Sequence, residues 1–274
     1  MTGLNDPRRA AVPTRDILIR AAQAAGQAAL MFYRRGETTT AGISNKGNNS
    51  PVTEADYAAD AAIRAILGKE LPDAAIFSEE ASEAPERHHQ PLVAVVDPID
   101  GTRAFIQGRD EWCISLALML EGVPVAGVIH APARGETYAA VAGHGATFNG
   151  RPLPLRKMAG SSPLRISGPN RLVDTLTEHW PPLSDGDTLR ALAYRFVSVA
   201  AGQHDIAVAT LGAHDWDIAA AEVILAETGC MITGFNGMRP VYNAAKPVHP
   251  ALIAGEARTV DRLVAALAQV EIRA

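Results

Sequence analysis

The run Leu92–Phe105, LVAVVDPIDGTRAF, constrains the fold of this chain more than any other stretch. Its first five residues, Leu92–Val96, are all apolar and predict a buried strand. The next residues, 97–101, read Asp-Pro-Ile-Asp-Gly, a mixture that strands disfavour. We therefore expect the strand to end in a tight turn that carries two carboxylates. Two acids held close together by a stiffening proline can converge on one hard cation.

The same turn also has an ordinary interpretation. Asp, Pro and Gly are the residues that solvated turns select, so this run alone favours metal chemistry and a plain surface turn about equally. Gly101 and Thr102 would expose backbone N–H groups at the turn, and Thr102 adds a hydroxyl. Hydrogen-bond donors beside a divalent ion would suit a phosphate group.

The flanking sequence predicts an N-terminal half built on an antiparallel sheet. Residues 1–13 lack periodicity and are expected to be a frayed arm, and Thr53 is a good N-cap for the second helix. The expected elements are helices over about 16–36 and Glu54–Leu67, and strands over Ala74–Phe77, Cys113–Leu120, Val123–His130, Glu136–Val141 and Ala146–Asn149. Because consecutive strands here are joined by short turns, they should pair in antiparallel fashion.

After residue 160 the pattern changes to alternating strands and helices. The expected elements are strands at Leu164–Ser167, near Thr188–Leu192, at His204–Ala209 and at Pro250–Ala254, and helices at Arg171–His179, Tyr194–Ala201, Trp216–Thr228 and Thr259–Val270. Alternation of this kind indicates a second α/β layer. We therefore divide the chain into an N-terminal half, residues 1–160, and a C-terminal half, residues 161–274.

Composition excludes several classes of protein. The formal net charge is −5, the pI is near 5.9 and no dense Lys/Arg stripe occurs, so binding a nucleic-acid polymer is not expected as the main function. Cys113 and Cys230 lie far apart and give neither a disulfide framework nor a thiolate metal site. The chain starts without the apolar segment of a signal peptide and contains no run long enough to span a membrane, so we expect a cytoplasmic protein.

Five carboxylates stand at the ends of predicted elements, where catalytic groups gather on α/β scaffolds. They are Asp56, Glu79, Asp97, Asp100 and Asp217. Each of them has an ordinary explanation by itself, such as favourable placement at a helix N-terminus. Taken together they form an all-oxygen set, which suits Mg²⁺ and not zinc.

Three separated motifs match a known family. They are Glu79-Glu80, the run Asp97–Thr102 (DPIDGT) and the run Trp216–Ala220 (WDIAA). In this order they resemble the motifs of the inositol monophosphatase superfamily, which comprises Mg²⁺-dependent, lithium-sensitive phosphatases. The resemblance implies an α/β (α+β) fold, a layered α-β-α-β-α sandwich of the inositol monophosphatase and fructose-1,6-bisphosphatase type. It also implies two or three Mg²⁺ ions per site, a small phosphorylated metabolite as substrate, and a homodimer, which is common in the family.

Within that superfamily, three runs look most like the bacterial 3'(2'),5'-bisphosphate nucleotidases of the CysQ type. They are Lys46–Asp56, Phe77–Glu80 and Thr102–Ile106. The run Ala209–Asp215 departs from the pattern, because it lacks both the arginine-containing run of such nucleotidases and the glutamate that inositol monophosphatases use on a sugar hydroxyl.

The resemblance also implies a role for each matching residue. The metal ligands are Glu79, Asp97, the backbone carbonyl of Ile99, Asp100 and Asp217. The catalytic residues are Asp56 and Thr102, which orient and deprotonate the attacking water, and Glu80, which contacts metal-bound water. The substrate-binding residues are Gly101 and Thr102, through their amides, with Arg103 and Arg195.

We expect an enzyme that removes the 3'-phosphate of adenosine 3',5'-bisphosphate. The nearest alternative is the same chemistry on inositol 1-phosphate or another sugar phosphate, because the metal half of the site would not change. A histidinol-phosphate phosphatase is favoured slightly by Arg103-Ala104-Phe105 and opposed by Trp216-Asp217. A non-catalytic metabolite sensor is a remote alternative, because such a protein would be expected to have lost metal ligands.

Overall fold

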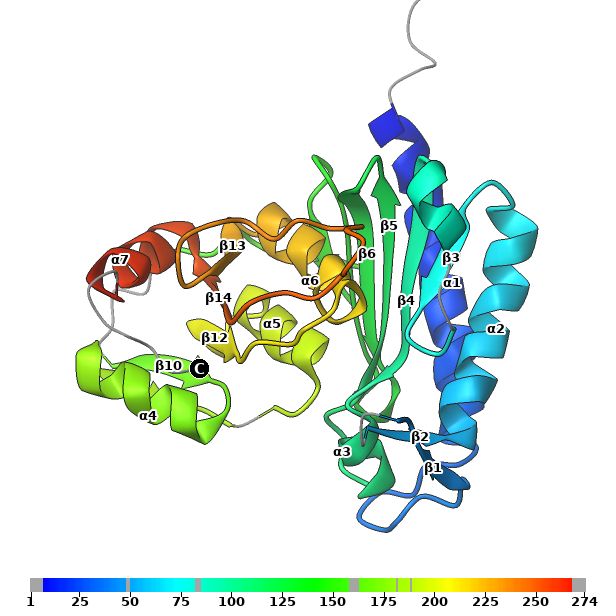
Figure 1. Cartoon of the computed structure of the whole chain (residues 1–274), viewed down its shortest axis with the longest axis horizontal. Coiled ribbons are helices and arrows are strands. Elements are labelled where there is room, and N and C mark those ends of the chain that lie inside the picture. The colour runs from blue at the N-terminus through cyan, green and yellow to red at the C-terminus, as the bar shows by residue number, and fades with distance from the viewer. Residues whose placement is uncertain are drawn as a thin grey trace, which may run out of the picture.

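Helices and sheets alternate in five layers in the computed structural model, in the order helix, sheet, helix, sheet, helix (Figure 1). The structure describes residues 7–47, 50–81, 85–157, 163–180, 182–187 and 189–267. The predicted α/β (α+β) class and the layered α-β-α-β-α sandwich are confirmed. The proposed division at residues 160 and 161 lies outside the described residues and stays a prediction.

The first sheet has seven strands among the described residues, in the spatial order β3-β4-β5-β6-β7-β8-β9. Its strands are β3 (Ala75–Ser78), β4 (Leu92–Asp100), β5 (Cys113–Leu120), β6 (Val123–Ala131), β7 (Glu136–Val141), β8 (Ala146–Phe148) and β9 (Arg151–Pro152). β3 and β4 pair in parallel and every other neighbouring pair is antiparallel, as the short turns predicted.

The prediction that the central strand ends at Val96 is wrong. β4 continues through Pro98 to Asp100, with a register shift against β5 between Asp97 and Asp100. A proline is tolerated there because β3 pairs with β4 only as far as Val96, so no neighbour on that side needs the missing N–H of Pro98. The irregular strand end places two acids at one corner of the sheet.

Two helices cover the outer face of this sheet, α1 (Pro7–Leu30) and α2 (Glu54–Glu70). Thr53 caps α2 as predicted, in a capping box with Asp56. The expected frayed arm is wrong from Pro7 onward, because α1 begins there, and a proline in the first helical turn sacrifices no hydrogen bond. The first six residues lie outside the described part of the chain. A short hairpin of β1 (Ile43–Asn45) and β2 (Pro51–Thr53) precedes α2.

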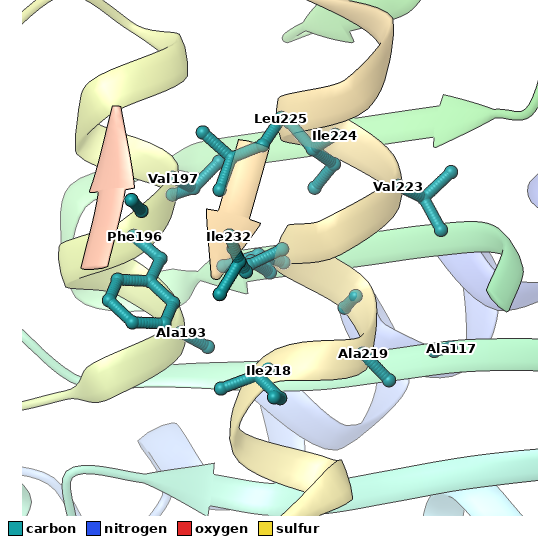
Figure 2. Packing of buried hydrophobic residues seen from close by; sticks show 14 of the residues in the cluster. Ala117, Ala193, Phe196, Val197, Ile218, Ala219, Val223, Ile224, Leu225 and Ile232 are labelled. Carbon is teal, nitrogen blue, oxygen red and sulfur yellow. The ribbon is translucent and has the colours of Figure 1, made fainter. Parts of the chain in front are cut away.

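The middle layer consists of α5 (Leu192–Ala200) and α6 (Asp215–Glu227), which pack between the two sheets. Both were predicted within a few residues. Figure 2 shows the apolar side chains of this layer, among them Phe196 and Ile218, meeting Ile232 of the second sheet. α6 is apolar on nearly every side because it is buried on both faces. It also lies very close to β6, where a Cβ at Gly127 would come 2.5 Å from the carbonyl oxygen of Ala220.

The second sheet has five strands among the described residues, in the order β11-β10-β12-β14-β13. Its strands are β10 (Leu164–Ser167), β11 (Leu183–Asp185), β12 (Ile206–Ala209), β13 (Cys230–Gly234) and β14 (Leu252–Glu256). The outer helices α4 (Asn170–His179) and α7 (Ala257–Leu267) pack with an apolar cluster on its far side. β13 was not predicted from the sequence.

One predicted strand of this half, near Thr188–Leu192, is wrong. Leu192 is the first residue of α5, the strand of this region is β11, and Thr188 lies outside the described residues. The predicted end of the last helix, Val270, also lies outside them. Cys113 and Cys230 are buried free thiols. Within the described part of the chain, no helix has the length and apolar character needed to cross a membrane.

Candidate active site

A cleft of about 560 Å³ opens where the end of β4 meets the first turns of α5, α6 and the short helix α3 (Thr102–Ile106). Its lining comes from both halves of the chain. The residues that line it are Ser50, Pro51, Glu79, Asp97, Ile99, Asp100, Gly101, Thr102, Arg103, Pro169, Arg190, Arg195 and Asp217.

Three carboxylates converge in this cleft. One side-chain oxygen from each of Asp97, Asp100 and Asp217 lies within 4.8 Å of the others. Asp97 and Asp100 come from the irregular end of β4 and are buried, whereas Asp217 stands in the first turn of α6 and is half-buried. Three of the five predicted acids are thus brought to one point, whereas Glu79 lines the same cleft outside this group.

Burial and mutual repulsion make this cluster unfavourable as three free anions. Burial, with repulsion from neighbouring carboxylates, raises the pKa of Asp97 and of Asp217 well above the usual range. Burial also raises the pKa of Asp100 to about 6, although hydrogen bonds from backbone N–H groups oppose this rise. A divalent cation would remove the repulsion, and an all-oxygen donor set suits a hard cation. The described residues therefore fit the metal that the sequence predicted.

Glu79 and Glu80 follow β3 and are held by one lysine. Lys46 Nζ lies 2.9 Å from Glu79 Oε1 and 2.8 Å from Glu80 Oε1. Glu79 lines the cleft, whereas the Glu80 side chain is only 3% exposed and lies behind it. Burial raises the pKa of Glu80 to about 7, and the neighbouring ammonium of Lys46 opposes this rise. The lysine supplies the positive charge that lets two adjacent glutamates stay together.

Asp56 and Thr102 meet beside the cleft. Thr102 Oγ1 lies 3.3 Å from Asp56 Oδ1 and 3.1 Å from the carbonyl oxygen of Ile99. The other oxygen of Asp56 accepts hydrogen bonds from the backbone N–H and the hydroxyl of Thr53. Burial raises the pKa of Asp56 to about 6, against the lowering effect of Thr53. One carboxylate oxygen is thus fixed by the helix cap, and the other faces the threonine hydroxyl.

Asp100 also fixes the start of α5. Its Oδ1 accepts a hydrogen bond of 3.0 Å from the backbone N–H of Leu192, and its Oδ2 accepts one of 2.6 Å from that of Ala193. Gly101 follows with φ of 88°, in the left-handed region that favours glycine. A Cβ at Gly101 would also lie 3.0 Å from the Cβ of Ala191, so α5 and this turn pack closely.

The predicted substrate-binding arginines differ in their surroundings. Arg195 is buried, and it donates through Nε to the carbonyl of Leu189 and through Nη1 to that of Val208. Burial lowers the pKa of Arg195 to about 10, and the charge of Asp100 opposes this. Arg103 is exposed at the edge of the cleft. Arg195 therefore lines the site while much of its hydrogen-bonding capacity is used to hold backbone.

Most of the predicted site residues line this one cleft. They are Glu79, Asp97, Ile99, Asp100, Gly101, Thr102, Arg103, Arg195 and Asp217. Asp56 and Glu80 do not line it. Asp56 accepts a hydrogen bond from the lining residue Thr102, and Glu80 shares Lys46 with the lining residue Glu79. Their roles as metal ligands, catalytic groups and substrate ligands stay predictions.

Two residues of the site were missed by sequence reasoning. Lys46 was quoted within a motif without a role, although two adjacent acids at a buried strand end already called for a nearby cation. Arg190 lines the cleft and is exposed. The sequence did not indicate that Arg190 belongs to the site, because the residue fell inside a predicted strand that the structure does not contain.

Comparison with known proteins places this fold in a family. A sequence profile of the Inositol monophosphatase family matches residues 11–271. The chain is 31% identical over 239 residues to a histidinol-phosphatase of Chlorobaculum parvum, covering 84% of this chain and 89% of that protein. It is 31% identical over 241 residues to the Nus factor SuhB of Pasteurella multocida, covering 82% of this chain and 86% of that protein. The solved IMPase of Thermotoga maritima superposes with a TM-score of 0.79 at 28% identity, covering 93% of this chain and 96% of that one.

The fold and the acidic cleft define a phosphatase of the layered sandwich type. The chain belongs to the inositol monophosphatase family, since the family profile matches nearly its whole length. The resemblance to the inositol monophosphatase superfamily is thereby confirmed, and so is the predicted class of enzyme, a phosphomonoesterase. The closer likeness to bisphosphate nucleotidases of the CysQ type stays a prediction. The metal dependence of this family is consistent with the cluster of Asp97, Asp100 and Asp217.

Proposed function

We propose that this chain is a Mg²⁺-dependent phosphatase that removes the 3'-phosphate of adenosine 3',5'-bisphosphate. The observation that carries the metal-dependent part is the convergence of Asp97, Asp100 and Asp217 in one cleft. The bisphosphate substrate is supported by the motifs that resemble bisphosphate nucleotidases and by three arginines in the lining, Arg103, Arg190 and Arg195.

The three clustered aspartates, with Glu79 in the same cleft lining, would hold the metal, which we expect to be two or three Mg²⁺ ions. When bound, Mg²⁺ neutralises charge on the phosphate and lowers the pKa of a coordinated water. Asp97 and Asp100 are buried and would hold the cation away from solvent, whereas Arg103 and Arg190 are exposed. The lining therefore offers one place for the reacting phosphate and another for the rest of the substrate.

Asp56 and Thr102 would prepare the attacking water. The Thr102 hydroxyl has one hydrogen, and either of its acceptors, Asp56 Oδ1 or the Ile99 carbonyl, can take it. The hydroxyl oxygen then has a lone pair to accept a hydrogen bond from water. Asp56, with a pKa raised by burial to about 6, is suited to receive a proton near neutral pH.

The substrate assignment rests on the arginines of the cleft lining, Arg103, Arg190 and Arg195. The relatives named above are a histidinol-phosphatase, a SuhB protein and an IMPase, and none of these three is a bisphosphate nucleotidase. Histidinol phosphate carries an amine, which a lining rich in arginine disfavours. Inositol 1-phosphate carries an uncharged polyol and is the alternative that the shared metal chemistry leaves in competition.

A side-by-side assay tests the proposal. Phosphate release with Mg²⁺ is measured on adenosine 3',5'-bisphosphate, inositol 1-phosphate and histidinol phosphate, and Asp97→Asn serves as the inactive control. We expect the highest kcat/KM on the bisphosphate and inhibition by lithium. A clearly higher kcat/KM on inositol 1-phosphate would overturn the substrate assignment. No phosphate release from any of the three esters would overturn the proposed phosphatase activity.

A further inference from the structure

Arg190 has a fixed position on the cleft and a free head group. It directly precedes Ala191, the N-cap residue of α5, and that helix start is bound to Asp100 through the N–H groups of Leu192 and Ala193. Ala191 also packs against Gly101 of the turn that follows β4. The backbone of Arg190 is therefore held by the same residues that form the acidic end of the cleft.

The side chain of Arg190 is not used to hold the fold. It is exposed, and among the residues that the structure describes none forms a hydrogen bond or ion pair with it. Arg195 differs, because it is buried and binds the carbonyl oxygens of Leu189 and Val208. A guanidinium that lines a cleft and lacks a protein partner is suited to bind an anion from the ligand.

The reacting phosphate does not need this arginine. In the proposed function, on which this inference rests, that phosphate would lie at the buried carboxylates Asp97 and Asp100, and the metal held there would balance its charge. Arg103 and Arg190 lie at the exposed edge of the same cleft. An anion bound there would be a different group of the same substrate.

We propose that Arg190, together with Arg103, binds a second anionic group of the substrate, a phosphate or a carboxylate, and so selects doubly anionic phosphate esters. A planar guanidinium can form two parallel hydrogen bonds to such a group, which a lysine cannot reproduce. The alternative is general electrostatic attraction of every phosphate ester, which would raise all rates alike and would not distinguish one ester from another.

Two esters that differ only in the second phosphate separate these explanations. kcat/KM is measured with Mg²⁺ on adenosine 3',5'-bisphosphate and on adenosine 3'-monophosphate, for the unchanged protein, Arg190→Gln and Arg190→Lys. We expect Arg190→Gln to lower the ratio of bisphosphate to monophosphate activity by about 10- to 100-fold, the range for a charged hydrogen bond. Arg190→Lys should lower it less, because the charge remains and the second hydrogen bond is lost.

Arg151→Gln is the matched control, because Arg151 is an exposed arginine of β9 outside the cleft lining. It should leave both activities unchanged. An unchanged ratio in Arg190→Gln, or an equal fall on both esters, would overturn the role of Arg190 while leaving the phosphatase intact. If the unchanged protein released no phosphate from the two adenosine esters or from inositol 1-phosphate, all three tested with Mg²⁺, the proposed function itself would be overturned.

Discussion

The carboxylate of Asp100 accepts a hydrogen bond of 2.6 Å from the backbone N–H of Ala193. Asp100 ends β4 in the first sheet, and Ala193 lies in the first turn of α5 in the middle layer. An acid at a helix N-terminus satisfies N–H groups that the helix leaves unpaired and interacts favourably with its dipole. One side chain of the proposed metal site therefore also joins two layers of the fold.

This double role predicts different effects for two equivalent substitutions. Asp97→Asn keeps an oxygen for the N–H of Ile99, which lies 3.0 Å from Asp97 Oδ1, and removes a buried charge. Asp100→Asn keeps one acceptor oxygen where two N–H groups now bind. We expect both variants to fold and to lose nearly all turnover. Without metal, Asp100→Asn should be less stable than Asp97→Asn by about 1–3 kcal/mol.

Urea unfolding in EDTA and phosphate release in Mg²⁺ measure the two effects. In addition, Mg²⁺ should raise the melting temperature of the unchanged protein and leave that of Asp97→Asn nearly constant. Equal stabilities of the two variants would contradict the role of Asp100 in holding α5. Activity retained in either variant would contradict the place of the substituted aspartate in the metal site.

The pKa values predict how the stability of the metal-free protein depends on pH. Burial raises the pKa of Asp56 and Asp100 to about 6 and that of Glu80 to about 7. The folded state therefore binds protons more tightly than the unfolded chain, where these groups titrate near pH 4. Their contribution is fully present below about pH 4 and is lost as the pH rises to about 7.

We therefore expect the free energy of unfolding, measured in EDTA, to fall between pH 5 and pH 8. Glu80→Gln should reduce that fall by about 1–3 kcal/mol, because it removes one of the buried carboxyls. Glu86→Gln is the control, since Glu86 is an exposed acid. A flat or rising profile in the unchanged protein would contradict the burial of these acids. Mg²⁺ should restore stability at pH 8, where the carboxylates are ionised.

The acidic half of the site could be predicted from sequence because its residues stand at the ends of strongly patterned elements. The local sequence predicts that an apolar strand runs up to Asp97 and that a helix begins near Asp217. The end of β4 was placed too early, since the sequence does not show that β3 stops pairing at Val96 and leaves room for Pro98. That outcome depends on a neighbouring strand and not on the residues of β4.

The basic half was less predictable because tertiary contacts position it. Residues near Arg190 look like a strand, and the start of α5 is set by a carboxylate far away in the sequence, Asp100. Lys46 was overlooked for a similar reason, since its partners Glu79 and Glu80 belong to a different element. Local sequence patterns do not predict such contacts between residues that are distant in the sequence.

Gly101 should resist substitution more than another glycine with a similar backbone. Gly101→Ala and Gly150→Ala both place an alanine at positive φ, 88° and 76°, which costs about 1–2 kcal/mol. Nothing lies within 4 Å of a Cβ at Gly150, whereas a Cβ at Gly101 meets Ala191 at 3.0 Å and the carbonyl of Glu111 at 3.2 Å. We expect Gly101→Ala to be less stable than Gly150→Ala by about 1–3 kcal/mol.

Urea unfolding of both variants measures this difference, and Mg²⁺-dependent turnover should fall only in Gly101→Ala. If both variants lose the same stability and Gly101→Ala keeps full turnover, the close packing of this turn against α5 does not matter for the site.

Thr102 offers a test of the proposed water-orienting pair. Its hydroxyl lies 3.3 Å from Asp56 Oδ1 and 3.1 Å from the Ile99 carbonyl, and removing it takes away the group that would align water with Asp56. We expect Thr102→Ala to lower kcat by about 100-fold, the scale of general-base catalysis, with little change in the Mg²⁺ concentration required. Thr102→Ser keeps the hydroxyl and should retain kcat within about tenfold, which separates chemistry from loss of packing. If Thr102→Ala keeps normal kcat, or if Thr102→Ser loses as much as Thr102→Ala, the hydroxyl is not part of the reaction.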